Sequence, residues 1–163
     1  MSLTQIHQEQ WNVASDQYRV WQQRWYLGLG EDFWAQSVQA LLRWEVKTRS
    51  GFRLTPQEKV SVGARPVITV PVGPFTIHEP VEVSDLVDQA NLAGFAYRTL
   101  PGHPVSGEEA FILQRQGPAV FLEIRSLTTA SDRRLWRILF PLLLLTQKLV
   151  RRRYRRALRQ QQP

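Results

Sequence analysis

The chain has 163 residues, of which 43% are hydrophobic and 10% aromatic; this is enough apolar material for one packed domain and excludes a wholly disordered chain. It contains no cysteine, which excludes disulfides, thiolate nucleophiles and cysteine-ligated zinc or iron–sulfur sites. The net charge of +7 is unevenly distributed, because ten basic residues and one acid lie between residue 132 and the C-terminus, and the slightly acidic remainder excludes a general nucleic-acid-binding surface.

Residues 1–15 are polar and predict a flexible arm, followed by a single domain over residues 16–163. Residues 18–29 alternate polar and apolar side chains, which predicts a strand. Glu31 and Asp32 suit the first turn of a helix, and apolar residues at helical spacing continue this helix to about Lys47. The arm has no basic segment before an apolar run, so no signal peptide is visible and we expect a cytoplasmic protein.

The middle of the chain is punctuated by proline and glycine and predicts a series of strands. We place these strands at residues 59–62, 67–72, 75–83, 93–100, 110–115 and 119–127. Gln116-Gly117-Pro118 predicts a tight turn between the last two. Because no helical pattern interrupts these strands, we expect an antiparallel sheet.

Residues 131–158 predict a long amphipathic helix with a kink at Pro141. Its apolar part, residues 135–145, is shorter than the about 20 residues that cross a membrane, so we expect it to pack on the sheet. The predicted fold class is therefore α+β, with a curved antiparallel sheet that grips a long C-terminal helix and with one N-terminal helix. A sheet of this kind commonly leaves a cavity beneath the helix.

The basic end of this helix has three interpretations. The arginines that we expect to bind an anionic surface are Arg151, Arg152, Arg155 and Arg156. The favoured interpretation is a solvated helix end. Binding to an anionic membrane surface comes second, and binding to nucleic acid comes third. A membrane-peripheral location would follow from the second interpretation.

Residues 94–111 read GFAYRTLPGHPVSGEEAF. This stretch resembles the GFAYxTLPGHPxxGEExF signature of an uncharacterised family, the domain of unknown function DUF1990. Residues 41–44, Phe121 with residues 123–124, and residues 151–158 match the family in order, so the resemblance covers residues 18–158. Arg98 stands where the family usually has glycine. The resemblance implies the helix-grip fold of START domains and birch-pollen-type allergens, which hold hydrophobic ligands beneath the final helix, and it implies no activity.

His103 is the strongest single candidate for a functional residue, because histidine titrates near neutral pH and this one lies in a rigid Gly-His-Pro loop. Its alternative role is to hydrogen-bond the backbone and fix the turn. Glu108 and Glu109 are adjacent, so on a strand they point to opposite faces and cannot act together on one substrate. We expect one of them to face the cavity or to pair with a buried arginine. Arg43, Arg98 and Arg125 are the candidates for that partner.

We therefore expect a non-enzymatic domain that binds a small hydrophobic or amphipathic ligand in the cavity. The expected ligand-binding residues are His103, Tyr97, Glu108, Glu109, Trp44 and Glu123. One alternative is an acid/base enzyme that uses His103 with Glu108 or Glu109 in the same cavity; another is an interaction protein that uses the basic helix end. No metal-ligand spacing and no phosphate-binding loop is present in the sequence, so we expect no metal and no cofactor. The sequence does not specify catalytic residues, the ligand or the oligomeric state.

Overall fold

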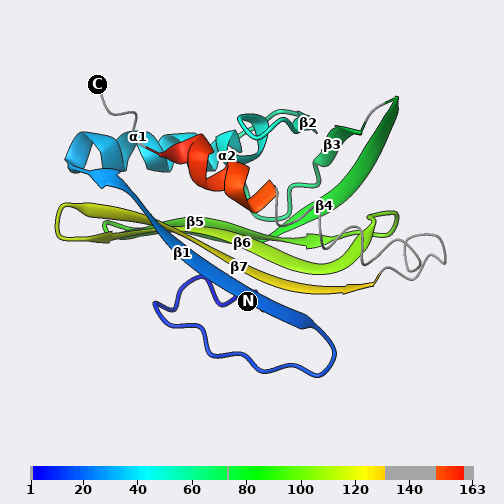
Figure 1. Cartoon of the computed structure of the whole chain (residues 1–163), viewed down its shortest axis with the longest axis horizontal. Helices are drawn as coiled ribbons and strands as arrows, with labels where there is room; N and C mark the ends of the chain where they lie inside the picture. The colour runs from blue at the N-terminus through cyan, green and yellow to red at the C-terminus, as the bar shows by residue number, and fades with distance from the viewer. Residues whose placement is uncertain (1, 73, 131–149, 160–163) are drawn as a thin grey trace.

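The structure, a computed structural model, describes residues 2–72, 74–130 and 150–159. Its main feature is one antiparallel seven-stranded sheet with the order β1-β7-β6-β5-β4-β3-β2 (Figure 1). The strands are β1 (Arg19–Leu29), β2 (Arg53–Thr55), β3 (Val67–Val72), β4 (Phe75–Asp88), β5 (Leu92–Thr99), β6 (Val105–Gln116) and β7 (Ala119–Ala130). The first strand pairs with the last, so the sheet brings residues from the two ends of the described domain together.

Helices lie on one face of the sheet and the N-terminal arm on the other (Figure 1). We call these the helix face and the arm face. The helix face carries α1 (Glu31–Leu42), α2 (Glu45–Thr48) and the C-terminal helix, residues 150–158. The C-terminal helix is held to the sheet by Tyr154 and Leu158, which are 3% and 4% exposed, and Arg49 donates a hydrogen bond of 3.1 Å to the Ala157 carbonyl.

Alternation along the strands divides the core into two unequal parts. In β6, Phe111 and Leu113 belong to a large cluster beneath the helices, whereas Ala110 and Ile112 belong to a small cluster with Ile6 of the arm. Most of the apolar burial that drives folding therefore lies on the helix face. Side chains at odd positions of β6 face the helices, and this parity decides where each predicted site residue lies.

Two glycines of the 94–111 stretch are required by strand packing. A Cβ on Gly94 would lie 2.4 Å from the Phe111 carbonyl oxygen. A Cβ on Gly107, which has a φ of +147°, would lie 1.8 Å from the Leu127 carbonyl oxygen. Backbones of neighbouring strands approach too closely at both positions for any side chain. These two parts of the signature are thus explained by the sheet itself.

The predicted α+β class and curved antiparallel sheet are confirmed, and the tight turn at Gly117 joins β6 to β7 with Gln116 opposite Ala119. The strand predicted at residues 59–62 is wrong, because those residues form no strand and β2 lies earlier in the chain. The predicted N-terminal helix is divided into α1 and α2. Of the long final helix the structure describes residues 150–158, and its predicted apolar half with Pro141 lies outside the described residues. The division into a flexible arm, 1–15, and a domain, 16–163, stays a prediction.

Candidate functional site

A turn after β5 brings His103 into the interior. The His103 N–H donates to the Leu100 carbonyl at 3.1 Å, and Gly102 has a φ of 104°. Proline at the second position and a positive-φ glycine at the third are typical of a type II turn. The ring of His103 is buried, and its Nδ1 accepts a hydrogen bond of 3.1 Å from the Val105 N–H.

The protonation of His103 follows from this environment. Because Nδ1 accepts a hydrogen bond, the neutral ring carries its proton on Nε2. Burial, assisted by the positive charge of Lys47, lowers the pKa of His103 to about 4. The ring is therefore neutral at pH 7 and presents an N–H donor at Nε2.

A break between α1 and α2 positions Lys47. Trp44 has a left-handed backbone with a φ of 63°, and its indole packs against Phe95 with the ring centroids 4.6 Å apart. The chain resumes as α2 in a new direction, and Lys47 on this short helix turns toward the sheet. Its side chain is only 3% exposed, so the break places a primary ammonium group inside the large apolar cluster.

The ammonium of Lys47 is held by two oxygens and surrounded by aromatic rings. It donates to Oε2 of Glu109 at 3.1 Å and to the Tyr154 hydroxyl at 2.5 Å. The centroids of four rings, Phe52, Tyr97, Phe111 and Tyr154, lie 4.7–5.2 Å from its nitrogen, at distances typical of cation–π contacts. Lys47 therefore has two oxygen acceptors and four aromatic neighbours.

Within the part of the chain that the structure describes, Glu109 has hydrogen-bond partners on one oxygen. Tyr97 donates its hydroxyl to Oε2, the oxygen that also binds Lys47. Burial alone would raise the pKa of Glu109, but the charge of Lys47 and the hydrogen bond from Tyr97 outweigh it, and the pKa is lower than usual. Among the described residues no donor reaches Oε1, and the side chain is 19% exposed. Glu109 is thus an ionised carboxylate with an open acceptor.

Glu79 of β4 is a second carboxyl in the same region. Burial raises its pKa, Lys47 opposes this effect, and the negative charge of Glu109 adds to it. Among the described residues, no hydrogen-bond or ion-pair partner is found for its carboxyl group. The charges of Lys47 and Glu109 act on both Glu79 and His103, so the four groups form one electrostatic cluster on the helix face.

Arg151 and Trp21 lie at the edge of this cluster. The guanidinium carbon of Arg151 lies 3.5 Å from the centroid of the Trp21 ring, and Nε is buried without a hydrogen-bond partner. Burial lowers the pKa of Arg151, while the charge of Glu109 opposes that shift. Trp21 also packs at 6.1 Å against Trp25, and both indoles are partly exposed beside the large cluster.

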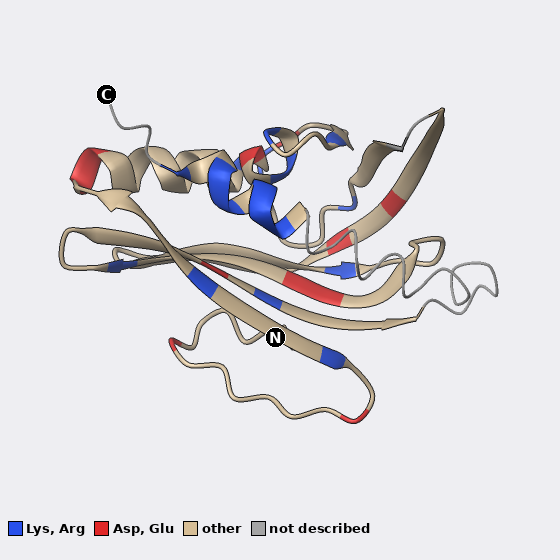
Figure 2. Cartoon of the chain, viewed as in Figure 1, with Lys and Arg blue, Asp and Glu red and all other residues tan. Residues whose placement is uncertain are grey.

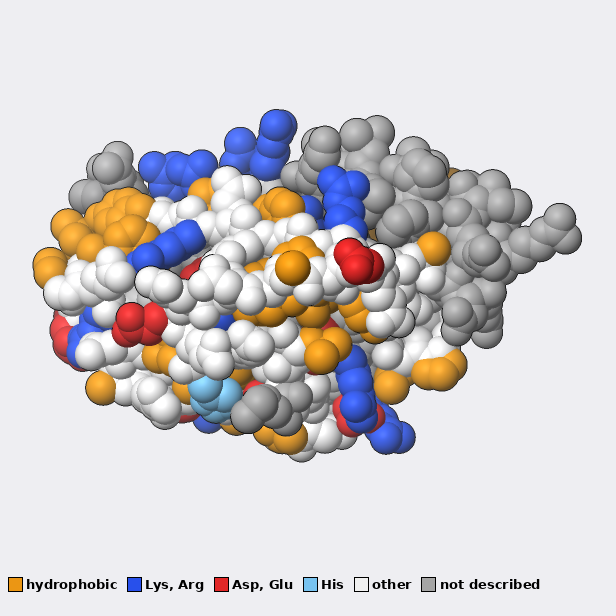
Figure 3. All heavy atoms as spheres, turned by 90° about the horizontal axis from the view of Figure 1, so that it is seen from below, with side chains coloured by type: hydrophobic (Ala, Val, Ile, Leu, Met, Phe, Trp, Pro, Cys, Tyr) orange, Lys and Arg blue, Asp and Glu red, His pale blue; other side chains and the backbone are white. Residues whose placement is uncertain are grey.

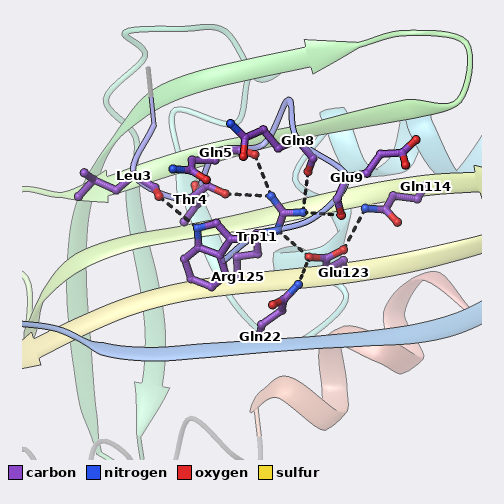
Figure 4. Close-up of polar contacts among 10 residues, drawn as sticks. All are labelled: Leu3, Thr4, Gln5, Gln8, Glu9, Trp11, Gln22, Gln114, Glu123 and Arg125. Carbon is purple, nitrogen blue, oxygen red and sulfur yellow. Dashed lines mark hydrogen bonds and ion pairs between the residues drawn. The ribbon is translucent and has the colours of Figure 1, made fainter. Parts of the chain in front are cut away.

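The arm face carries a different buried network, centred on Arg125 (Figure 4). Arg125 is fully buried, and its nitrogens donate to Oε1 of Glu123 and to four carbonyl oxygens of the arm. Those carbonyls belong to Thr4, Gln5, Gln8 and Glu9. Glu123 also accepts hydrogen bonds from Gln22 and Gln114. All five donors of a guanidinium are used, so this network fixes the arm against the sheet.

The structure divides the six predicted ligand-binding residues between the two faces. His103, Tyr97, Glu109 and Trp44 lie on the helix face. Glu108 lies on the arm face, where Thr4 donates to Oε1 and Ser84 to Oε2. Glu123 lies there too, beside Arg125.

The expected arginine partners of the glutamate pair are corrected. Lys47 pairs with Glu109, whereas Arg98 pairs with Glu82 and Arg125 with Glu123. Arg98 points to the arm face, as its opposite neighbour Glu108 does. The Arg98 side chain therefore takes up no space on the helix face.

Sequence reasoning missed Lys47, Glu79 and Tyr154. Lys47 lies in a short charged stretch that suggests a solvated helix end, and only the break at Trp44 turns it inward. The parity of β4 could have identified Glu79, because it shares a face with Val81 and Val83 of the core. Tyr154 is buried on the side of the C-terminal helix that faces the large cluster. Within the described parts of the chain, no group of three or more possible metal ligands is found.

Several solved structures of low sequence identity share this fold. A hypothetical protein, jhp0584, from Helicobacter pylori has a TM-score of 0.65 at 12% identity, covering 96% of this chain and 97% of that one. The allergen Ara h 8.0201 has a TM-score of 0.56 at 6% identity, with 86% and 97% covered. The major latex-like protein 151 of Panax ginseng gives 0.52 at 11% identity, with 83% and 97% covered. These likenesses show the fold.

Two comparisons of amino-acid sequence identify proteins related to this chain. A UPF0548 protein of Deinococcus radiodurans is 47% identical over 47 residues, which is 28% of this chain and about a quarter (24%) of that protein's length. The family described as a domain of unknown function, DUF1990, matches residues 3–157. This match includes the His103 turn, Lys47, Glu109 and Tyr154. The chain therefore belongs to the DUF1990 family, and its allergen-like fold agrees with the architecture that the sequence resemblance implied.

Proposed function

We propose that this protein binds a small amphipathic molecule on the helix face of its sheet, beneath the C-terminal helix. The observation that carries the proposal is the open Oε1 of Glu109, an ionised oxygen surrounded by aromatic and aliphatic side chains. The Glu109 side chain is 19% exposed, and Oε1 is not among the buried atoms that lack a partner, so this oxygen is accessible to a ligand. A ligand that donates a hydrogen bond to it would form a charge-assisted bond beside apolar side chains.

The apolar part of the ligand would contact rings that are only partly covered. Trp21 and Trp25 of β1 pack against the large cluster and retain exposed surface. Burying such surface contributes about 25 cal/mol per Å², so two indoles supply affinity without specificity.

The polar end of the ligand would be a hydrogen-bond donor, either an alcohol or an amine. Lys47 is enclosed and already paired with Glu109 and Tyr154, so it is not free to bind a carboxylate. Glu109 offers an acceptor, and His103 offers the N–H of Nε2 as a second polar contact. A few polar groups placed within an apolar lining are typical of small-molecule sites.

The acid/base alternative has weaker support at His103. Nδ1 already accepts a backbone hydrogen bond, and among the described residues no carboxylate bonds to the ring. A general base needs a free nitrogen and a pKa near the working pH. With a pKa of about 4, His103 suits a fixed donor better than a proton acceptor.

Native mass spectrometry and titration with three amphiphiles of equal chain length test the proposal. We expect dodecanol and dodecylamine to bind more tightly than dodecanoic acid. Glu109→Gln should weaken dodecylamine about tenfold, since a charge-assisted hydrogen bond exceeds a neutral one by roughly 1.4 kcal/mol.

Glu108→Gln is the matched control. It makes the same change one residue away on the arm face, so it should leave all three affinities unchanged. Failure of every probe to bind would refute the proposal. Tighter binding of dodecanoic acid would refute the assignment of a hydrogen-bond donor at the polar end of the ligand, but it would still support a binding site on the helix face.

A further inference from the structure

A groove on the outer surface lies between α1 and the C-terminal helix, which are neighbours on the helix face (Figure 1). It has a volume of about 1090 Å³. The end of β1 and one side of α1 form one part of its lining. The other part is formed by Arg49 and by five residues of the C-terminal segment, Arg153, Arg156, Ala157, Leu158 and Arg159. None of the residues in the Lys47–Glu109 cluster lines this groove, so it is a separate site.

The charge of the groove is strongly positive on the side of the C-terminal helix, where basic residues are concentrated (Figure 2). Arg153, Arg156 and Arg159 are exposed, and among the described residues no carboxylate pairs with them. Two of the other charged groups are neutralised, because Arg49 pairs with Glu45 and Glu31 pairs with Arg115. Asp32 is the remaining acid of the lining.

The groove also has apolar surface. Ala40 and Leu158 are buried in its floor, and Phe33 and Ala157 are partly exposed. Leu29 at the rim is 52% exposed. Exposed apolar surface beside unpaired cations is complementary to a molecule that is both anionic and hydrophobic. A free phosphate would use only the arginines.

We propose that this groove is a docking site for an anionic lipid bilayer, with lipid headgroups at Arg153, Arg156 and Arg159. Leu29 and Phe33 contact the upper acyl region. Nucleic acid fits less well, because single strands need several stacking rings and, of the described residues that line the groove, Phe33 alone is aromatic.

The four arginines predicted from the sequence to bind an anionic surface differ in their positions in the structure. Arg156 lines the groove, whereas Arg151 turns inward and stacks on Trp21. Arg152 and Arg155 are exposed on the same helix and would add to the attraction at longer range. Docking at this groove would bring the C-terminal helix, which covers the Glu109 site, to the membrane surface.

Co-sedimentation with vesicles tests this inference. The full chain is mixed with vesicles of phosphatidylcholine alone or of phosphatidylcholine with phosphatidylglycerol, and we expect binding to the anionic vesicles only. In the double variant Arg153→Gln with Arg156→Gln, binding should weaken about 30-fold. Each basic residue near such a surface contributes about 1 kcal/mol, and about 1.4 kcal/mol is a factor of ten.

A control variant separates the groove from net charge. Arg24→Gln with Lys59→Gln removes the same charge from exposed positions outside the groove, and it should change binding less than about threefold by screening alone. An equal loss in both variants would overturn the proposal, as would equal binding to the two vesicle types or stronger retention on single-stranded RNA. Glu109→Gln should leave vesicle binding unchanged, so this result is independent of the ligand site.

Discussion

Glu108 and Glu109 are neighbours in the chain, yet the polar networks around them differ in one respect. On the arm face, Glu108 has donors on both oxygens, and Arg125 beside it uses every N–H of its guanidinium. On the helix face, Glu109 has donors on one oxygen. Figure 3 views the molecule from the side of the arm, and most of the visible side chains are uncharged.

This difference separates a structural network from a candidate site. Buried polar groups are normally paired, and each exception requires an explanation. The arm-face network needs no further partner, so we interpret it as the anchor of residues 2–11. On the helix face, no donor among the described residues reaches Oε1 of Glu109 or the Glu79 carboxyl, and both side chains keep some exposed surface, so these acceptors are available to a ligand.

The strongest test of the anchor is Arg125→Met. It would leave Glu123 and four backbone carbonyls buried without their donor, and breaking a buried pair from one side costs about 3–5 kcal/mol. We expect a loss of about 4 kcal/mol in the free energy of unfolding, measured by urea denaturation, with faster proteolysis of the arm. Arg24→Met, at an exposed position on the same face, should cost less than about 1 kcal/mol. Equal losses would show that Arg125 anchors nothing.

A smaller effect is expected on the helix face, where His103 makes the folding stability depend on pH. The pKa of His103 is about 4 in the folded chain against an ordinary value of 6.5, so the unfolded chain binds a proton that the folded chain excludes. The stability due to the neutral ring is present above the ordinary pKa and is lost as the pH falls. Linkage predicts a loss of about 2 kcal/mol between about pH 7 and about pH 5.

The control for this pH dependence is His103→Asn, whose amide oxygen can accept the Val105 N–H in place of Nδ1. Lys47 and Glu109, the charged groups that act on the ring, are unchanged in this variant. Urea titrations of both proteins at the two pH values measure the difference. The same pH dependence in both would mean that His103 is not held neutral.

The sequence predicted only part of the contrast between the two faces. The alternation rule correctly separated Glu108 from Glu109, because opposite faces follow from strand geometry alone. The same geometry places Tyr97 and Arg98 on opposite faces of β5. What it could not supply was the partner across the core: Lys47 reaches Glu109 through a left-handed residue at Trp44, and a non-glycine residue with positive φ has little local signal.

The fold was easier to predict than the site for a physical reason. Strands and turns are specified by local periodicity and by residues such as Pro101, Gly102 and Gly117, each of which acts within a few positions. Residues 59–62 show the limit, because an apolar alternation too short to be paired was overridden by tertiary context. Glu123 shows a similar limit: its face was decidable from parity, but its contacts with Arg125 and the arm carbonyls are fixed only by long-range packing.

The finest comparison removes one hydroxyl from each face. Thr4→Val deletes a donor to Glu108, and Tyr97→Phe deletes a donor to Glu109. Each should lower the free energy of unfolding by about 1 kcal/mol, the usual value of one hydrogen bond. The two should differ in dodecylamine titration, because only Tyr97→Phe changes the carboxylate that we assign to the ligand. Without the hydroxyl, Glu109 loses a donor that lowers its pKa, so amine binding becomes more sensitive to acid in Tyr97→Phe and stays unchanged in Thr4→Val. Identical titrations for both variants would place the ligand away from Glu109.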